Sequence, residues 1–80
     1  MLRKKNIRVS PYNSERLKRE IYSHYKNPIL REGQFVFNTA YQLYPTAAQA
    51  AMQVCDCYYQ DHKIDGFIDA LCNYLNEHTS

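Results

Sequence analysis

Two cysteines separated by one residue, Cys55 and Cys57, are the first side chains in this chain of 80 residues that could do chemistry. Two thiolates at that spacing would suit half of a metal or redox site. On a helix, however, residues two apart point about 200° away from each other, so both sulfurs cannot reach one ion. There is no CxxC pair. We therefore expect Cys55 in the core and Cys57 at its edge, where a Cys57→Ser substitution is tolerated.

The histidines and aspartates do not suggest a reactive site either. His24, His62 and His78 are too scattered for a ligand set or a catalytic triad. Four aspartates follow one another at short intervals without the loop and central glycine of an EF-hand, and we interpret them as a solvated acidic face: Asp56, Asp61, Asp65 and Asp69. The sequence thus favours a protein that is not an enzyme, with no catalytic residue, no metal and no cofactor.

Opposite charges gather in the two halves of the chain. Residues 1–40 hold nine Lys and Arg against three Asp and Glu, whereas residues 41–80 hold one Lys against five acidic residues. A formal net charge of +2 therefore conceals a strongly polar molecule. Such a field attracts partners of opposite charge to its two ends.

We predict that the basic half docks on a larger protein. The expected contact residues are Arg8, Arg16, Lys18, Arg19 and Tyr22, and the residues expected to steer the partner from a distance are Arg3, Lys4 and Lys5. The rival site is the acidic face of the four aspartates, which would suit a basic partner. Charge reversal of each patch in turn separates the two.

A nucleic acid is the alternative partner, because the basic residues could follow a phosphate backbone. The sequence pI of about 8.5 is modest for that role. The segment 64–69 would also make a poor recognition helix, since it has no basic or amide side chain to read bases.

Eight tyrosines and three phenylalanines replace much of the aliphatic content of an ordinary core. Tyrosine suits interfaces, and a domain this small has little stability to spare. We therefore expect self-association, as a homodimer in which the basic first helix of one copy lies against the acidic last helix of the other.

Hydrophobic spacing predicts four helices. Leu17, Ile21 and Tyr25 recur every four positions in a helix at 13–26, which ends before Pro28. Residues 34–44 fit either a helix or an alternating strand, and a helix is slightly favoured. An alanine-rich helix follows at 46–61, and a last amphipathic helix at 64–76.

The fold prediction is an all-α, small four-helix bundle-like domain over residues 13–80, with a basic N-terminal arm at 1–12. The alternative is an α+β domain in which residues 35–44 or the arm form a short strand or hairpin. The predicted core comprises Leu17, Ile21, Tyr25, Val36, Ala40, Leu43, Ala51, Met52, Cys55, Ile64, Phe67, Ile68, Leu71 and Leu75.

The functional prediction is a small non-enzymatic protein-binding regulator, an adaptor or inhibitor that occludes a surface of a larger complex. Its size is common among phage and mobile-element accessory proteins. No run near the start of this sequence has the length or apolarity of a signal peptide's hydrophobic segment, and no stretch reaches 18 apolar residues. We therefore expect a cytoplasmic protein with reduced cysteines and no membrane partner. The alternative is a nucleic-acid-binding accessory protein.

Overall fold

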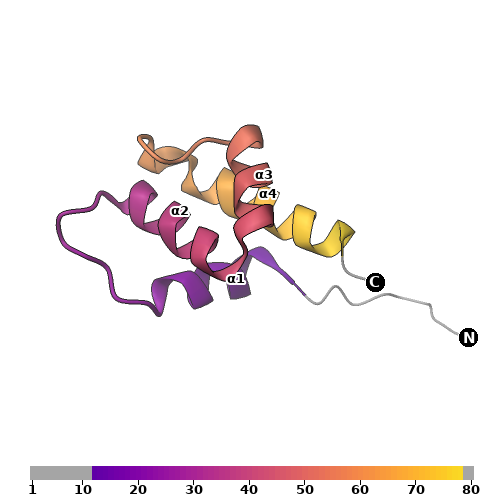
Figure 1. Ribbon diagram of the computed structural model, residues 1–80, viewed down its shortest axis with the longest axis horizontal. Coiled ribbons are helices and arrows are strands. Elements are labelled where there is room, and N and C mark those ends of the chain that lie inside the picture. The colour runs from indigo at the N-terminus through magenta and orange to yellow at the C-terminus, as the bar shows by residue number, and fades with distance from the viewer. Residues whose placement is uncertain (1–11, 79–80) are drawn as a thin grey trace, which may run out of the picture.

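The computed structural model describes residues 12–78, which form four α-helices and one turn of 3-10 helix (Figure 1). The elements are α1 (Ser14–Tyr22), α2 (Glu32–Leu43), α3 (Pro45–Val54), η1 (Asp61–Lys63) and α4 (Ile64–Glu77). Over this range no strand occurs, so the all-α prediction is confirmed and a strand at 35–44 is wrong.

At both ends of helix α1 a side chain forms a hydrogen bond with the helix backbone. The Asn13 side chain caps its start by accepting from the backbone N–H of Arg16 at 2.8 Å. At the other end the Ser23 hydroxyl donates to the carbonyl oxygen of Glu20 at 2.6 Å. The predicted helix at 13–26 therefore stops at Tyr22. Tyr25, predicted in the core, lies in the following loop and is 83% exposed, so that prediction is wrong.

Helices α2 and α3 meet with one residue between them. Tyr44 ends the first helix, and Pro45 occupies the first turn of the next, where its missing N–H costs nothing. The predicted helix at 46–61 is too long, because α3 ends at Val54. Residues 55–60 turn back instead towards the start of α2.

The two neighbouring cysteines exchange the places predicted for them. Cys57 has no exposed surface, and its thiol donates to the carbonyl oxygen of Gly33 across 3.6 Å. Cys55 is only half-buried. The prediction assumed a helix through both residues, whereas they lie beyond its end, where the helical phase no longer relates them.

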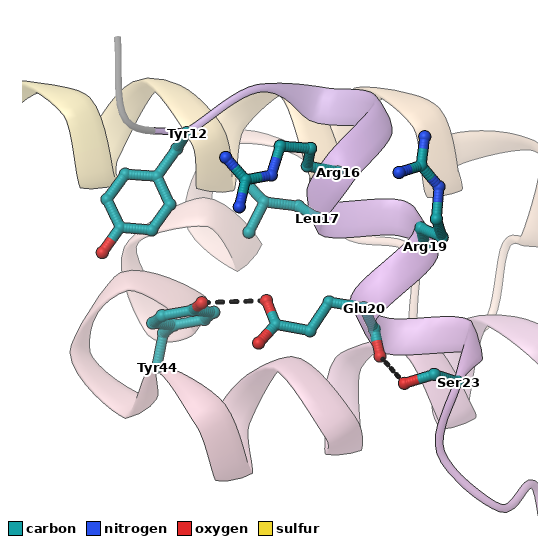
Figure 2. A pocket seen from close by; sticks show the side chains of 7 residues that line it. All are labelled: Tyr12, Arg16, Leu17, Arg19, Glu20, Ser23 and Tyr44. Carbon is teal, nitrogen blue, oxygen red and sulfur yellow. Dashed lines mark hydrogen bonds between the residues drawn. The ribbon is translucent and has the colours of Figure 1, made fainter.

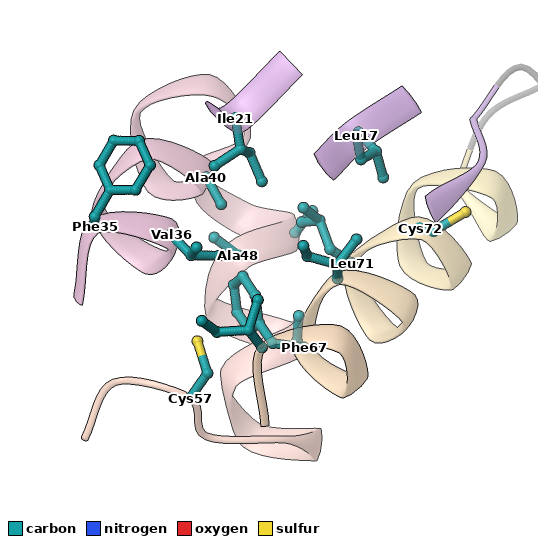
Figure 3. Packing of buried hydrophobic residues seen from close by; sticks show 14 residues of the cluster. Leu17, Ile21, Phe35, Val36, Ala40, Ala48, Cys57, Phe67, Leu71 and Cys72 are labelled. Carbon is teal, nitrogen blue, oxygen red and sulfur yellow. The ribbon is translucent and has the colours of Figure 1, made fainter. Parts of the chain in front are cut away.

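The core lies where α4 packs against α3, with α2 and α1 closing the remaining sides (Figures 1 and 3). Small side chains of α3, including Ala48 and Ala51, admit Phe67 and Leu71 of α4 closely. Nine predicted core residues are buried: Leu17, Ile21, Val36, Ala40, Ala51, Ile64, Phe67, Ile68 and Leu71. Four more are half-buried at the edge: Leu43, Met52, Cys55 and Leu75.

Candidate functional site

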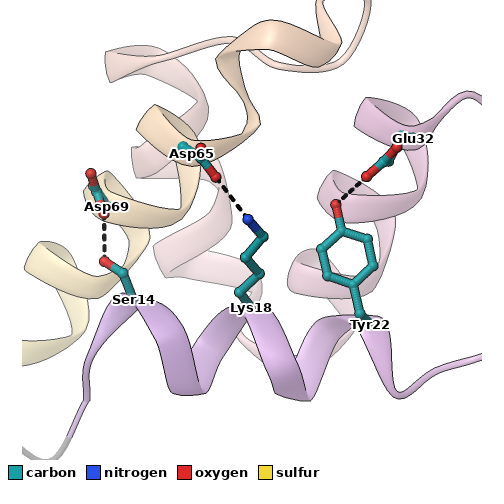
Figure 4. Close-up of polar contacts among 6 residues, drawn as sticks. All are labelled: Ser14, Lys18, Tyr22, Glu32, Asp65 and Asp69. Carbon is teal, nitrogen blue, oxygen red and sulfur yellow. Dashed lines mark hydrogen bonds and ion pairs between the residues drawn. The ribbon is translucent and has the colours of Figure 1, made fainter.

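One side of α1 carries a row of polar side chains that bind other helices of the same chain (Figure 4). The row consists of Ser14, Lys18 and Tyr22, each four residues from the next. The Lys18 ammonium pairs with Asp65 of α4 at 3.1 Å, and the Ser14 hydroxyl donates to Asp69 one turn further along. The Tyr22 hydroxyl donates to Glu32 of α2 at 2.6 Å. We call these three residues the polar row.

The polar row joins two sites that the sequence presented as rivals. Lys18 and Tyr22 belong to the predicted basic docking surface, while Asp65 and Asp69 belong to the predicted acidic face. Lys18 and Asp65 contact each other directly, whereas Tyr22 bonds Glu32 and Asp69 accepts from Ser14. The contact expected between two copies, a basic first helix against an acidic last helix, exists here within one chain.

The remaining two aspartates hold backbone turns. Asp56 accepts from the N–H of Tyr58 at 2.9 Å, and Asp61 accepts from the N–H of Gly33 at 3.0 Å. Asp61 thereby ties η1 to the first turn of α2. Each predicted acidic residue therefore has a partner inside the molecule.

The opposite side of α1 is open. Arg16 and Arg19 are exposed, and neither guanidinium has an ion-pair or hydrogen-bond partner within the described residues. They border a surface pocket of about 470 Å³ (Figure 2), which is lined by Tyr12, Arg16, Leu17, Arg19, Glu20, Ser23 and Tyr44. Figure 2 shows the Arg16 side chain extending towards Tyr12, with Arg19 at the rim.

The walls of this pocket are fixed by contacts from several elements. The backbone of Tyr12 exchanges two hydrogen bonds with the Asn76 side chain, at 3.2 and 3.0 Å. The rings of Tyr12 and Tyr44 meet edge to face with centroids 6.0 Å apart. The Tyr44 hydroxyl donates to Glu20 at 2.9 Å. Burial, reinforced by this bond to a carboxylate, raises the pKa of Tyr44 to about 12.

Beyond the pocket, the loop of residues 23–31 carries the two most exposed large apolar side chains of the described chain. Tyr25 is 83% exposed and Ile29 is 87% exposed. The loop is ordered by its own hydrogen bonds: the Asn27 side chain accepts from the N–H of Ile29 at 3.0 Å, and the Lys26 ammonium donates to the carbonyl oxygen of Leu30 at 2.6 Å. It projects from the helices at the end opposite the C-terminal turn of α4 (Figure 1).

The thiols of Cys55 and Cys57 have different surroundings. Burial raises the pKa of Cys57 to about 12, which keeps it a neutral thiol at ordinary pH. The Cys55 sulfur lies 3.5 Å from the carbonyl oxygen of Lys63, away from the partner of Cys57. In the part of the chain from 12 to 78, no group of three His, Cys, Asp or Glu side chains could hold a metal ion.

The structure places the predicted docking residues of α1 on two sides of the helix. Arg16 and Arg19 lie together at the pocket, but Lys18 and Tyr22 are engaged elsewhere. Arg8 and the steering residues Arg3, Lys4 and Lys5 lie outside the described residues.

Sequence reasoning missed the pocket-lining residues Tyr12, Glu20, Ser23 and Tyr44 and the exposed loop. One sequence feature could have pointed to this pocket: Glu20 lies four positions after Arg16, and residues at that spacing share a face of a helix.

Comparison with protein-family models, with curated proteins and with solved structures finds no match to this chain. In residues 12–78 no helix has both the length and the apolar character needed to cross a bilayer.

Proposed function

We propose that this chain is a small, non-enzymatic protein-binding regulator that covers a surface of a larger complex with the open side of α1 and the loop that follows it. One observation carries the proposal. Among the described residues, Tyr25 and Ile29 are the most exposed large apolar side chains, and they lie in the loop that begins at the rim of the pocket. Arg16 and Arg19, which border this pocket, have no ion-pair partner in the same part of the chain.

That arrangement has the composition of a binding surface. Protein interfaces combine apolar or aromatic anchors with a polar rim, and arginine and tyrosine are enriched among the residues that contribute most. The hydrogen bonds within residues 26–30 hold the loop in shape before any partner arrives. A preformed loop loses less conformational freedom on binding, which favours affinity.

Further parts of the proposal rest on the sequence alone. They are a cytoplasmic location, an origin in a phage or mobile element, a homodimer, and long-range steering by the basic arm. The homodimer loses one of its arguments, because Lys18 already pairs with Asp65 in the same chain. The tyrosine-rich surface remains in its favour.

The test is affinity capture from the native host with the full chain and two loop variants, Tyr25→Ser and Ile29→Ser. Each has a control that removes an exposed side chain of the same or a similar kind elsewhere: Tyr59→Ser, 68% exposed in the parent, for Tyr25→Ser, and Val54→Ser, 77% exposed, for Ile29→Ser. A captured protein is then purified and its affinity measured directly. We expect each loop variant to weaken binding by about tenfold or more and the controls to leave it unchanged.

Two results would contradict the proposal. One is an equal loss for the loop variants and their controls. The other is retention on DNA or heparin with a steep salt dependence and no protein partner, which would favour the nucleic-acid alternative.

A further inference from the structure

The Arg16 guanidinium of α1 has no ion-pair or hydrogen-bond partner among the described residues. Arg16 and Glu20 lie four residues apart on one face of α1, a spacing at which opposite charges ordinarily pair. Among the described residues no ion pair joins them. One carboxylate oxygen of Glu20, Oε1, instead accepts the Tyr44 hydroxyl at 2.9 Å, so Glu20 has a partner other than Arg16 (Figure 2).

The charges in the pocket favour a monoanion. Two arginines and one glutamate line it and leave one net positive charge. A guanidinium presents paired N–H donors that match the two oxygens of a carboxylate. A phosphate dianion would be repelled by the Glu20 carboxylate. The single net positive charge of the pocket would balance only one of its two negative charges.

The size and walls of the pocket admit more than a carboxylate. Its volume of about 470 Å³ lies within the range of ordinary ligand pockets. Tyr12, Tyr44 and Leu17 offer apolar surface beside Arg16, and the Asn76 bonds fix Tyr12 in place. An apolar side chain next to the carboxylate would therefore find a preformed wall.

We infer that this pocket is a carboxylate-binding subsite, in which Arg16 binds a carboxylate of the partner protein while Tyr12 and Tyr44 hold a neighbouring apolar side chain. The inference rests on the proposed function and names the chemistry that one part of the docking surface recognises. The carboxylate comes from an Asp or Glu side chain or from the C-terminus of the partner. Arg19, at the rim, adds attraction over a longer distance.

Three short peptides test the inference by NMR titration of the full chain. Acetyl-Phe-Glu-Phe-amide offers only a side-chain carboxylate, acetyl-Phe-Gln-Phe with a free C-terminus offers only a terminal one, and acetyl-Phe-Gln-Phe-amide offers neither. We expect saturable shifts of the Arg16 Nε–H and of the Tyr12 and Tyr44 ring protons with one or both charged peptides, at dissociation constants of about 1 mM. Which charged peptide binds identifies the source of the carboxylate.

Matched variants assign the binding to Arg16. Arg16→Gln should weaken the charged peptide about tenfold, and Arg19→Gln about twofold, because Arg19 lies at the exposed rim. Lys63→Gln removes the same charge from η1, outside the pocket, and should change nothing. All three variants are checked for an unchanged urea midpoint.

Tyr44→Phe tests how Arg16 is kept available. Without the hydroxyl, Glu20 is released to pair with Arg16, and the charged peptide should bind about threefold more weakly. Added to Glu20→Gln, the same change should have no further effect, because the competing acid is already gone. If Tyr44 acted only through packing, the effect of Tyr44→Phe on peptide binding would be the same with and without Glu20→Gln.

The inference is overturned if none of the peptides shifts these resonances at peptide concentrations up to about 10 mM. It is also overturned if the uncharged peptide binds as well as the charged ones, or if inorganic phosphate binds here more tightly than either charged peptide. These outcomes are separate from the proposed function. A captured partner whose affinity depends on Tyr25 and Ile29 but not on Arg16 would leave the regulator proposal standing and remove this one.

Discussion

The two sides of α1 carry similar polar residues and use them in opposite ways. On one side, the polar row of Ser14, Lys18 and Tyr22 is bound to α4 and α2. On the other, Arg16 and Arg19 reach solvent beside a pocket. Nothing in the order of residues along this helix distinguishes the two sides as binding surfaces. The difference lies in the intramolecular contacts, which the fold supplies on one side of the helix.

The bound side continues into the start of α2, where Gly33 lies close to the backbone of Cys57. Gly33 bonds the Asp61 side chain through its N–H and the Cys57 thiol through its carbonyl oxygen. We therefore expect substitutions on the bound side to reduce stability, and substitutions on the open side to reduce binding while leaving stability nearly unchanged.

The largest expected effect is from Gly33→Ala. A Cβ atom there would lie 1.9 Å from the carbonyl oxygen of Cys57, so the backbone of α2 or of residues 55–60 would have to move. We expect a loss of at least about 3 kcal/mol in the free energy of unfolding, measured by urea denaturation.

Gly66→Ala is the matched control for that substitution. Its Cβ would meet the Cys55 sulfur at 2.7 Å, a half-buried side chain that can rotate away, and alanine favours the helix by about 1 kcal/mol. Equal losses for the two variants would contradict the close approach at Gly33.

Cys57→Ser should cost about 1–3 kcal/mol, contrary to the tolerance expected from sequence. The serine hydroxyl would be fully buried, and the 3.6 Å separation from the Gly33 oxygen suits a sulfur donor rather than an oxygen. Cys55→Ser, at a half-buried position, should cost less. If thermal and urea unfolding rank the two variants in the opposite order, the packing described for Cys57 is wrong.

The next largest effect is expected from alkaline pH, which should lower the free energy of unfolding. The pKa of Cys57 is raised from 9.0 to about 12 by burial, so the folded chain keeps this proton while the unfolded chain loses it. The resulting stability is complete below about pH 9 and declines between pH 9 and 12, by at most about 1.4 kcal/mol per pH unit. Urea titrations at pH 8, 9 and 10 should show that slope, and Cys57→Ala should flatten it. Tyr44, whose pKa is also raised, contributes only above pH 10.

The smallest effects come from single charges on the two sides of α1. Lys18→Ala breaks an ion pair whose side chains are 48% and 80% exposed, so it should cost less than about 1 kcal/mol, and the cost should vanish in 1 M salt. Arg16→Ala should change stability by no more than about 0.5 kcal/mol at any salt concentration. A salt-dependent loss for Arg16 would show that its guanidinium has a partner in solution.

The sequence predicted the elements whose hydrophobic spacing is regular and failed where helices end. The apolar stripes of α1 and α4 led directly to Leu17, Ile21, Phe67 and Leu71. Tyr25 was misplaced because the Ser23 hydroxyl closes α1 early, and a cap of this kind does not interrupt the periodicity. Cys57 was misplaced because α3 stops at Val54, so rules for a helical face no longer applied to it.

The open side of α1 was only half predictable for a different reason. Sequence identifies basic residues, but the choice of Lys18 rather than Arg16 as a partner for Asp65 depends on how α1 lies across α4. The pocket depends in turn on Tyr44, which a one-residue joint between α2 and α3 brings beside Glu20. Such contacts join residues more than 20 positions apart, beyond the reach of local patterns.

The burial of Cys57 also makes its thiol a natural probe of local opening of the fold. An alkylating reagent can reach this thiol only in the moments when residues 55–60 part from the first turn of α2. Cys55, two positions away and half-buried, reports the rate at which an accessible thiol reacts under the same conditions. The ratio of the two labelling rates therefore measures the fraction of time for which this corner of the fold is open, and no cysteine has to be introduced.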